Sequence, residues 1–281
     1  MAEEGCTHDC SGCAKNCADR KEKFDFSAKL NAASQVRKVV AVASGKGGVG
    51  KSFVTAMLAV AAARRGLNVG ILDADITGPS IPKAFGLSGG TIQGEHGIEP
   101  AVTDGGIRVM SLNMLIDDPS APVVWRGPVI AGAVKQFWTD VHWGDLDIMF
   151  VDMPPGTGDV PLTVFQSLPV DGVVIVSSPQ KLVEMIVGKS VKMAQMMEKK
   201  VLGLVENMSY FTCPNCEAKH AVFGESQADA LAKRFDIQNV LRLPIDPSYS
   251  QAIDAGAAES LVLPEIDTFV KQLTSTNGDM K

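Results

Sequence analysis

A glycine-rich segment with two lysines and a terminal serine is the strongest chemical signal in the sequence. Residues 45–52 read GKGGVGKS, which matches the pattern GxxxxGK[ST], and they stand between an apolar run at 39–44 and a helical pattern at 51–65. In this context the backbone N–H groups of the loop surround a phosphate, and the helix directs its positive end at the same anion. We therefore predict an ATP site made by Gly45, Gly47, Gly48, Val49, Gly50, Lys51 and Ser52. Lys51 would contact the β- and γ-phosphates, and the Ser52 hydroxyl would hold Mg²⁺.

Three aspartates and a second lysine complete the predicted catalytic site. Asp73 and Asp75 close one apolar run and Asp152 closes another, and ligands bind at the carboxyl ends of strands in open α/β sheets. We expect Asp152 to hold the Mg²⁺ shell and Asp75 to position the attacking water, with Asp73 as its neighbour. A turn or N-cap role for one of this pair is the alternative. Lys46 adds a cation that would stabilise transition-state charge, unless it is simply a solvated loop residue.

The six cysteines fall into two compact groups, which suggests metal ligands. The sequence Cys213-Pro214-Asn215-Cys216 supplies two thiolates, half of a four-thiolate site, and a second copy related by a two-fold axis would complete it. A [4Fe–4S] cluster and zinc are equal alternatives for this pair, and His220 is either a third ligand or a packing residue. The other group follows C-x3-C-x2-C-x3-C, a spacing that can wrap one cluster or one zinc ion per chain; its members are Cys6, Cys10, Cys13 and Cys17.

Alternation of apolar runs with helical patterns predicts the fold class. Such alternation is typical of βαβ units, so we expect an α/β protein with a doubly wound, mostly parallel sheet of the P-loop NTPase type. The predicted strands are 39–44, 69–75, 107–113, 146–154, 172–178, 201–207 and 239–245, and the predicted helices are 51–65, 129–140, 181–200, 226–235 and 264–273. We expect a cysteine-rich metal-binding segment at 1–20, a linker at 21–37 and an ATPase domain at 38–281, with a cysteine loop at 208–220. Residues 86–106 and 117–128 read as long loops.

Composition argues against several classes of protein. Among 281 residues, 46% are hydrophobic and 21% charged, the formal net charge is −6, and no cluster of basic residues is present. Nucleic-acid binding requires clustered Lys and Arg, so no such partner is expected. The longest apolar run is too short to span a bilayer, and the acidic, polar first residues do not resemble a signal peptide. We therefore expect a cytoplasmic protein without a membrane partner.

Several longer motifs resemble the Mrp/ApbC family of P-loop ATPases, whose members carry iron–sulfur clusters. They are VASGKGGVGKS, LDADITGPSIPKAFG, VVWRGP, WGDLDIMFVDMPPGTGD, VENMSYFTCPNC and LPIDPSYSQAIDAG, and the resemblance extends over residues 39–261. The resemblance implies a homodimer with ATP near the interface and a [4Fe–4S] cluster bridged by paired CxxC motifs. A departure is Glu217, because the family usually has glycine after CPxC.

The same resemblance assigns roles to individual residues. Lys46 marks the deviant P-loop shared with MinD, ParA and the nitrogenase iron protein, and it would reach the partner's nucleotide. Asn207 would contact the adenine, and the Gly156 N–H would meet the γ-phosphate. We expect an ATP-dependent carrier that delivers clusters to apo iron–sulfur acceptor proteins. The alternatives are an ATP-driven electron donor, a MinD- or ParA-type positioning ATPase and a zinc-stabilised ATPase.

Overall fold

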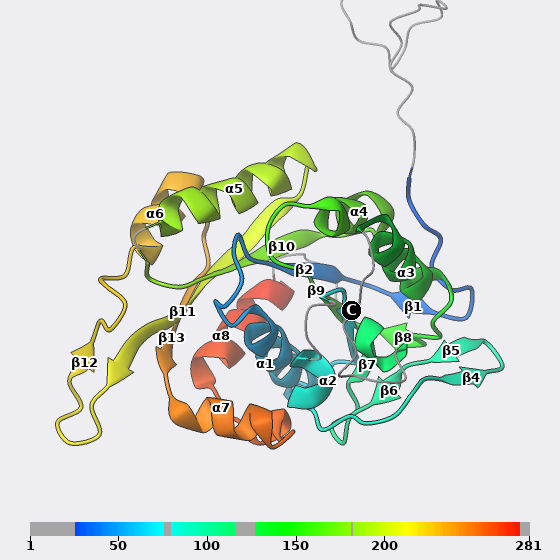
Figure 1. The fold of residues 1–281 in the computed structure, drawn as a ribbon, viewed down its shortest axis with the longest axis horizontal. Helices are drawn as coiled ribbons and strands as arrows, with labels where there is room; N and C mark the ends of the chain where they lie inside the picture. Colours follow the sequence, from blue (N-terminus) through cyan, green and yellow to red (C-terminus); the bar gives the residue numbers. More distant parts are fainter. Residues whose placement is uncertain (1–25, 76–79, 116–126, 181, 276–281) are drawn as a thin grey trace, which may run out of the picture.

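A central, mostly parallel sheet organises the chain. The computed structural model describes residues 26–75, 80–115, 127–180 and 182–275 (Figure 1). Within them a nine-stranded sheet has the order β12-β11-β10-β2-β9-β3-β7-β6, and β13 also pairs with β11. Within this sheet, as far as the structure describes it, the β11–β12 and β6–β7 pairs are antiparallel and the others parallel. The strands are β2 Val39–Ala43, β3 Val69–Asp73, β6 Ala101–Val102, β7 Arg108–Ser111, β9 Ile148–Asp152, β10 Gly172–Ser177, β11 Lys200–Thr212, β12 Lys219–His220 and β13 Val240–Ile245.

Helices cover both faces of this sheet. On one face lie α3 Gly127–Thr139, α4 Asp159–Ser167, α5 Val183–Met196 and α6 Ala228–Phe235 (Figure 1). On the other lie α1 Lys51–Arg64, α2 Ser80–Ala84, α7 Pro247–Asp254 and α8 Pro264–Ser275. Short 3₁₀ helices span Leu112–Leu115 and Ala258–Ser260. The expected doubly wound α/β architecture is confirmed.

Burial on both faces explains why the central strands could be located from sequence. In β2, Val39 and Ala41 face the core layer under α3–α6, whereas Val40 and Val42 face the layer under α1 and α8. All five residues of β2 are buried. A strand enclosed on both sides reads as a continuous aliphatic run, and such runs are characteristic of parallel sheets. The site-bearing strand ends are thus fixed by two apolar layers.

Part of the predicted linker at 21–37 is packed against the domain. The short strands β1 Gln35–Val36 and β8 Asp145–Leu146 pair in parallel. The Ala28 N–H donates to the Ser167 carbonyl at 2.8 Å, and the Trp138 indole N–H donates to the Ala28 carbonyl at 3.1 Å. Residues 26–37 therefore have fixed hydrogen-bond partners, which the polar composition of this segment did not indicate. The predicted loop at 86–106 likewise contains the hairpin β4 Ile92–Gly94 and β5 Gly97–Glu99, followed by β6.

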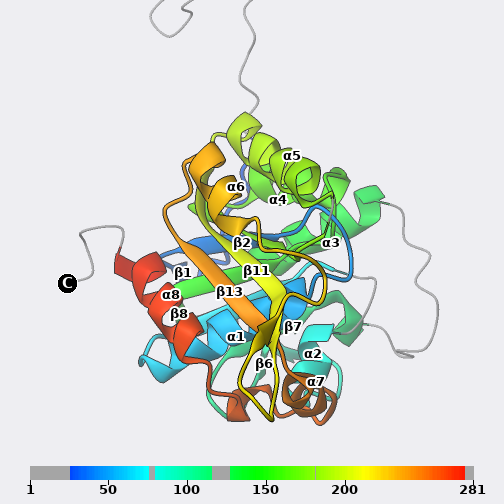
Figure 2. The ribbon, with the colours of Figure 1, turned by 90° about the vertical axis from the view of Figure 1, so that its left-hand side faces the viewer.

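The strand β11 is longer than expected. The sequence predicted a strand at 201–207 followed by a loop, but β11 continues to Thr212 and turns back as β12. Phe211 pairs with His220 and Thr212 with Lys219, so Cys213 and Cys216 lie in the tip of a hairpin. Figure 2 shows β11 and β13 side by side, leading toward this hairpin. The cysteine pair is consequently attached to the central sheet by a continuous strand.

Candidate functional site

The predicted phosphate loop joins β2 directly to α1. Gly48 and Gly50 have φ angles of 75° and 77°, in the left-handed region that glycine adopts without steric cost. A Cβ at Gly50 would also overlap the side-chain amide of Asn207. The loop geometry therefore requires glycine at this position for two reasons, the backbone conformation and the close approach of β11. The helix that follows begins at Lys51, so its N-terminal N–H groups open onto the loop.

One carboxylate, that of Asp152, collects three donors from the start of α1. The Lys51 ammonium lies 2.8 Å and the Ser52 hydroxyl 2.6 Å from Asp152 Oδ2. The Thr55 hydroxyl donates to the other oxygen, Oδ1, at 2.6 Å. Asp152 and Thr55 are fully buried, and Lys51 is nearly so. The sequence did not single out Thr55, although a hydroxyl one helical turn after Lys51 was a readable signal.

Ser52 and Asp152 fit the requirements of a magnesium site. Mg²⁺ prefers oxygen ligands in octahedral geometry and is typically held by one or two protein groups, with phosphate and water oxygens completing the shell. The Ser52 hydroxyl and Asp152 Oδ2 present two such oxygens side by side, next to the phosphate loop. When bound, the ion would neutralise phosphate charge. The residues expected to hold it are therefore brought together.

The two aspartates at the end of β3 differ in their contacts. Asp75 Oδ2 lies 3.4 Å from the Lys51 ammonium, so this carboxylate faces the phosphate site. Asp73 is buried and accepts hydrogen bonds from the Asp75 N–H at 3.0 Å and the Ser111 hydroxyl at 2.8 Å. Burial, followed by repulsion from Asp152, raises the pKa of Asp73 well above its usual value. The geometry gives Asp73 a turn-forming role beside the site and places Asp75 nearer to Lys51 of the phosphate loop.

Two other predicted phosphate contacts have partners within the chain. The Gly156 N–H, expected at the γ-phosphate, donates to the Ser44 carbonyl at 2.8 Å. The Lys46 ammonium donates to the Gln180 side-chain oxygen. Each group would have to exchange its present partner to contact a nucleotide.

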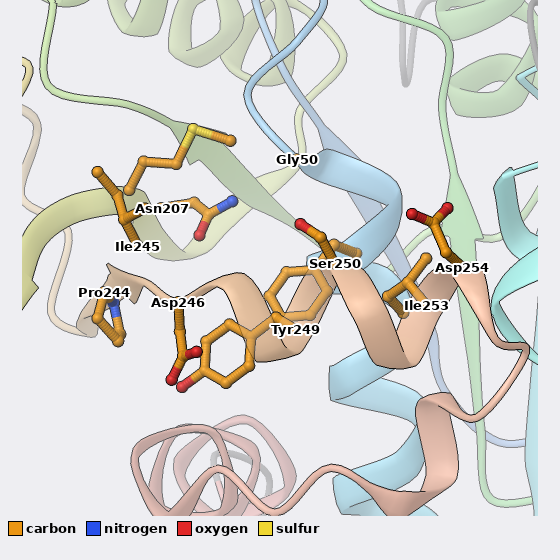
Figure 3. A pocket seen from close by; sticks show the side chains of 11 residues that line it. Gly50, Asn207, Pro244, Ile245, Asp246, Tyr249, Ser250, Ile253 and Asp254 are labelled. Atoms are coloured by element: carbon orange, nitrogen blue, oxygen red, sulfur yellow. The ribbon is translucent and has the colours of Figure 1, made fainter.

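A pocket of about 330 Å³ opens beside the phosphate loop. Asn207 enters it from β11, and its amide N–H donates to the Val49 carbonyl at 3.0 Å. Figure 3 shows residues of α7 and of the preceding corner on the same pocket. Phe53 and Tyr249 stack at its wall, with ring centroids 5.5 Å apart and an interplanar angle of 19°. The lining residues are Gly50, Phe53, Asn207, Met208, Pro244, Ile245, Asp246, Tyr249, Ser250, Ile253 and Asp254.

This pocket has the character of a base site. Apolar and aromatic walls with a few polar groups are typical of small-molecule pockets, and the location next to the phosphate loop suits the base of a nucleotide. Asn207 was predicted for this region, whereas Phe53 and Tyr249 were not.

The start of α7, which carries Tyr249, did have a signal in the sequence. An aspartate followed by proline, here Asp246-Pro247, is typical of a helix start. In the structure the Asp246 carboxylate caps α7 by accepting from the Ser248 N–H at 2.8 Å.

The cysteine hairpin closes through backbone hydrogen bonds. The Cys213 N–H donates to the Ala218 carbonyl, and the Glu217 N–H donates to the Cys213 carbonyl, both at 2.9 Å. The backbone N–H of Asn215, and then the backbone and thiol of Cys216, lower the pKa of Cys213. Glu217 takes a φ of 59°, in the left-handed region that favours glycine, the residue that the family resemblance led us to expect here. The tight turn is therefore formed at a position where a side chain is unfavourable.

Among the described residues, Cys213 and Cys216 are the two candidate metal ligands at this hairpin tip. Cys213 is half-buried and Cys216 exposed. No group of three or more His, Cys, Asp or Glu side chains able to hold a metal ion occurs in the described residues, so His220 does not complete a site within one chain. Cys6, Cys10, Cys13 and Cys17 lie outside the described residues. Over the same described ranges, no helix is both long and apolar enough to cross a membrane.

Fold and site together define the class of a P-loop NTPase. The family model described as "ParA: NUBPL iron-transfer P-loop NTPase" matches residues 35–276. The chain belongs to this family of P-loop NTPases, within the broader Mrp/ApbC group that the motifs indicated.

Relatives named for iron–sulfur cluster work support the same placement. An "Iron-sulfur cluster carrier protein" of Methanocaldococcus jannaschii is 43% identical over 263 residues, which covers 91% of this chain and 90% of the relative. A "Cytosolic Fe-S cluster assembly factor CFD1" of Eremothecium gossypii is 42% identical over 230 residues, which covers 79% of this chain and 82% of the relative.

Solved structures agree with the fold. A nucleotide-binding protein from Archaeoglobus fulgidus, solved in complex with ADP, has a TM-score of 0.74 and 45% identity, covering 82% of this chain and 90% of that one. A MinC:MinD complex from Aquifex aeolicus has a TM-score of 0.60 at 18% identity, covering 87% of this chain and 98% of that one, and this likeness concerns the fold alone.

Proposed function

We propose that this protein is an ATP-dependent iron–sulfur cluster carrier that holds a [4Fe–4S] cluster between two copies and transfers it to apo-proteins. The observation that carries the proposal is the isolated Cys213–Cys216 pair at a hairpin tip, on a strand that also lines the nucleotide pocket. Hydrogen bonds that lower the pKa of Cys213 favour the thiolate, the form that binds metal. With Cys216 exposed and Cys213 half-buried at the hairpin tip, the pair is accessible both to a second copy and to an acceptor.

A homodimer follows from the number of ligands. A [4Fe–4S] cluster takes four thiolates, and each chain offers two at this site. Exposed apolar side chains flank the phosphate loop and the cysteine hairpin, namely Leu182, Met185, Val222 and Phe223. Apolar groups that gather on one surface are typical of interaction sites. A second copy seated there would bring the two cysteine pairs together and lead Lys46 to the partner's nucleotide.

ATP hydrolysis supplies the driving step. Water attacks the γ-phosphorus, the bond from that phosphorus to the bridging oxygen breaks, and ADP and phosphate leave. Asp75 would orient the water, while Lys46 and Lys51 would stabilise charge on the phosphates. The neighbouring Ser52 and Asp152 oxygens support a Mg²⁺ role for both residues, and Asn207 would contact the adenine. Binding and hydrolysis would favour different arrangements of the dimer and thereby change how firmly the cluster is held.

Cluster delivery is a ligand exchange without net electron transfer. Acceptor thiolates replace the Cys213 and Cys216 thiolates one at a time, and the displaced thiolates take up protons from solvent. The acceptors are apo iron–sulfur proteins, and a cytoplasmic location without membrane or nucleic-acid partners suits this role. The Cys6, Cys10, Cys13 and Cys17 thiolates would hold a second cluster or a zinc ion.

Cluster transfer to an acceptor tests the proposal. Cluster-loaded protein is mixed anaerobically with an apo-ferredoxin, and holo-acceptor formation is followed with ATP, with ADP and without nucleotide. We expect transfer to occur and its rate to depend on the nucleotide. A cluster that survives redox cycling but never reaches the acceptor would identify an electron donor instead. The matched control is the Cys213→Ala/Cys216→Ala variant, which should retain ATP binding and lose transfer.

A further inference from the structure

A single strand, β11, carries both the base-facing residue and the cysteine hairpin. Asn207 and Met208 line the nucleotide pocket, and Cys213 follows the last residue of the strand. From Met208 to Cys213 the chain advances only five residues (213 − 208). A local change in the backbone of this short stretch could therefore affect both the pocket and the cysteine hairpin.

The strand is irregular at one position between these sites. Met208 has a φ of 58°, in the left-handed region that is rare for a residue with a bulky side chain. Glu206 pairs with Arg242 and Tyr210 with Pro244, so β11 advances four residues (206 to 210) while β13 advances two (242 to 244). Two extra residues are accommodated as a bulge centred on Met208. Bulges of this kind occur beside functional sites and redirect the strand that follows.

Contacts hold this bulge on both sides. On its amino-terminal side the Asn207 amide donates to the Val49 carbonyl of the phosphate loop. Across it, the buried Ser209 hydroxyl donates to the buried Glu206 carboxylate at 2.7 Å. On its carboxy-terminal side the hairpin is held by the Phe211–His220 and Thr212–Lys219 pairs. These contacts hold β11 on both sides of the bulge, so the irregular position at Met208 lies between two fixed segments of the same strand.

The Met208 side chain faces the pocket in which a bound nucleotide could displace it. It lines the pocket, and its terminal methyl lies 3.9 Å from the position that a Cβ on Gly50 would take. A base entering the pocket therefore meets the thioether at the bulge and the Asn207 amide beside it. A strained backbone position next to a ligand site is a recognised way to build a switchable element.

We propose that Met208 is a positioning residue through which an adenine nucleotide in the pocket sets the orientation of the Cys213–Cys216 hairpin. This inference rests on the proposed nucleotide site and gives the carrier its route from nucleotide to cluster. It requires neither a bound cluster nor a second copy of the chain, so the two accounts can fail independently.

Thiol alkylation in the full-length, cluster-free chain tests this inference. The rate of iodoacetamide modification at Cys213 and Cys216 is measured by peptide mass spectrometry, which separates them from the N-terminal cysteines, with and without Mg-ADP or Mg-ATP. In the wild type we expect nucleotide to change the rate by at least about fivefold, the lower range of measured coupling between sites. Met208→Gly removes both the thioether and the strain, so at nucleotide concentrations that saturate each protein the change should fall below about twofold.

Matched variants separate positioning from general effects. Glu198→Gly relieves a left-handed residue with a φ of 55° in the turn after α5, away from the bulge, and should leave the nucleotide effect intact. Met208→Leu keeps an apolar side chain and the backbone constraint and should also retain it. If Met208→Gly does not fold, Met208→Ala carries the same expectation because it removes the thioether.

The proposal is overturned if nucleotide leaves the wild-type rates unchanged. It is equally overturned if the effect persists in Met208→Gly, since protection would then arise elsewhere, for example from association of two chains. Iron binding is measured separately on the same preparations. A wild-type chain that assembles a cluster normally but shows no nucleotide effect on alkylation refutes this inference alone, whereas absence of a cluster at these cysteines refutes the proposed function.

Discussion

Thr55 and Asp152 are joined by a buried hydrogen bond of 2.6 Å, from the hydroxyl on α1 to the carboxylate at the end of β9. This bond occupies Asp152 Oδ1 and leaves Oδ2 to Lys51 and Ser52. The rotamer of Asp152 is thereby fixed with one oxygen toward the predicted metal site. Precise ligand orientation by such neighbours is a general feature of metal sites.

Replacing Thr55 with valine should impair the metal-dependent step. Thr55→Val preserves shape but removes the hydroxyl, and a hydrogen bond to a charged group contributes about 1.5–3 kcal/mol. We expect the ATPase rate to fall roughly tenfold to a hundredfold and the Mg²⁺ concentration for half-maximal rate to rise. Thr55→Ser should restore both quantities. An unchanged Mg²⁺ requirement in Thr55→Val would contradict this role.

Replacing Lys51 with alanine should affect stability as well as nucleotide binding. Lys51→Ala leaves the buried Asp152 carboxylate without its nearest cation, and breaking a buried ion pair costs about 3 kcal/mol or more. Thermal unfolding should show a clear fall in Tm, and labelled ATP should no longer bind. Lys83→Ala is the control, because the Lys83–Asp254 pair has side chains 57% and 69% exposed and such pairs contribute about 0–1 kcal/mol. Equal losses of Tm in the two variants would argue against the buried pair.

The buried carboxyl of Asp73 predicts a specific dependence of stability on pH. Its pKa is raised in the folded state, so folding takes up a proton; this stabilisation is complete below the unfolded value of about 3.9 and is lost as pH rises through the folded value. Asp73→Asn keeps an oxygen for the Asp75 N–H and cannot ionise. The variant should therefore gain stability relative to the wild type as pH rises, by about 1.4 kcal/mol per unit of pKa shift.

Urea unfolding at several pH values measures this difference. The exposed Asp104 provides the control, because Asp104→Asn removes the carboxyl of a residue on the surface. A difference between Asp73→Asn and wild type that stays constant from acid to neutral pH would show that burial of Asp73 does not affect proton binding.

Glu217 predicts a stabilising substitution in the cysteine hairpin. A residue with a Cβ in the left-handed region costs about 1–2 kcal/mol, and Glu217→Gly removes that cost. Amide hydrogen exchange should slow at the Cys213 and Glu217 N–H groups, which close the turn. Glu225→Gly removes a nearby exposed glutamate with the same charge and should not slow exchange. Faster exchange in Glu217→Gly would mean that the glutamate side chain supports the turn.

Much of this architecture could be predicted because its signals are local. The β2–loop–α1 unit combines a buried strand, glycines with positive φ and a helix start within a few residues. Asp152 was found because it ends a strand enclosed by both core layers. Local patterns of this kind predict only part of the order of strands in the sheet. They do predict which strand ends bear the charged groups.

The remaining parts depend on contacts between distant segments. Phe53 and Tyr249 stack although they are 196 positions apart (249 − 53), and no spacing in the sequence links them. The extension of β11 was missed because Ser209, Tyr210 and Phe211 belong to no continuous aliphatic run. Pairing of Tyr210 and Phe211 with β13, and of Phe211 with β12, stabilises this part of the strand. Residues 26–37 were predicted to be a linker because their composition is polar. In the sequence, polar residues that hydrogen-bond to the domain cannot be distinguished from residues that face solvent.

Counting metal on the cysteine hairpin tests the central claim most directly. Cys6, Cys10, Cys13 and Cys17 are first replaced by serine, the protein is reconstituted anaerobically with iron and sulfide, and Mössbauer spectra are recorded with and without Cys213→Ala/Cys216→Ala. A bridged cluster predicts a [4Fe–4S] signal with about four iron atoms per dimer, lost in the double variant. Tightly bound zinc at these cysteines, or iron that survives their removal, would contradict the carrier account.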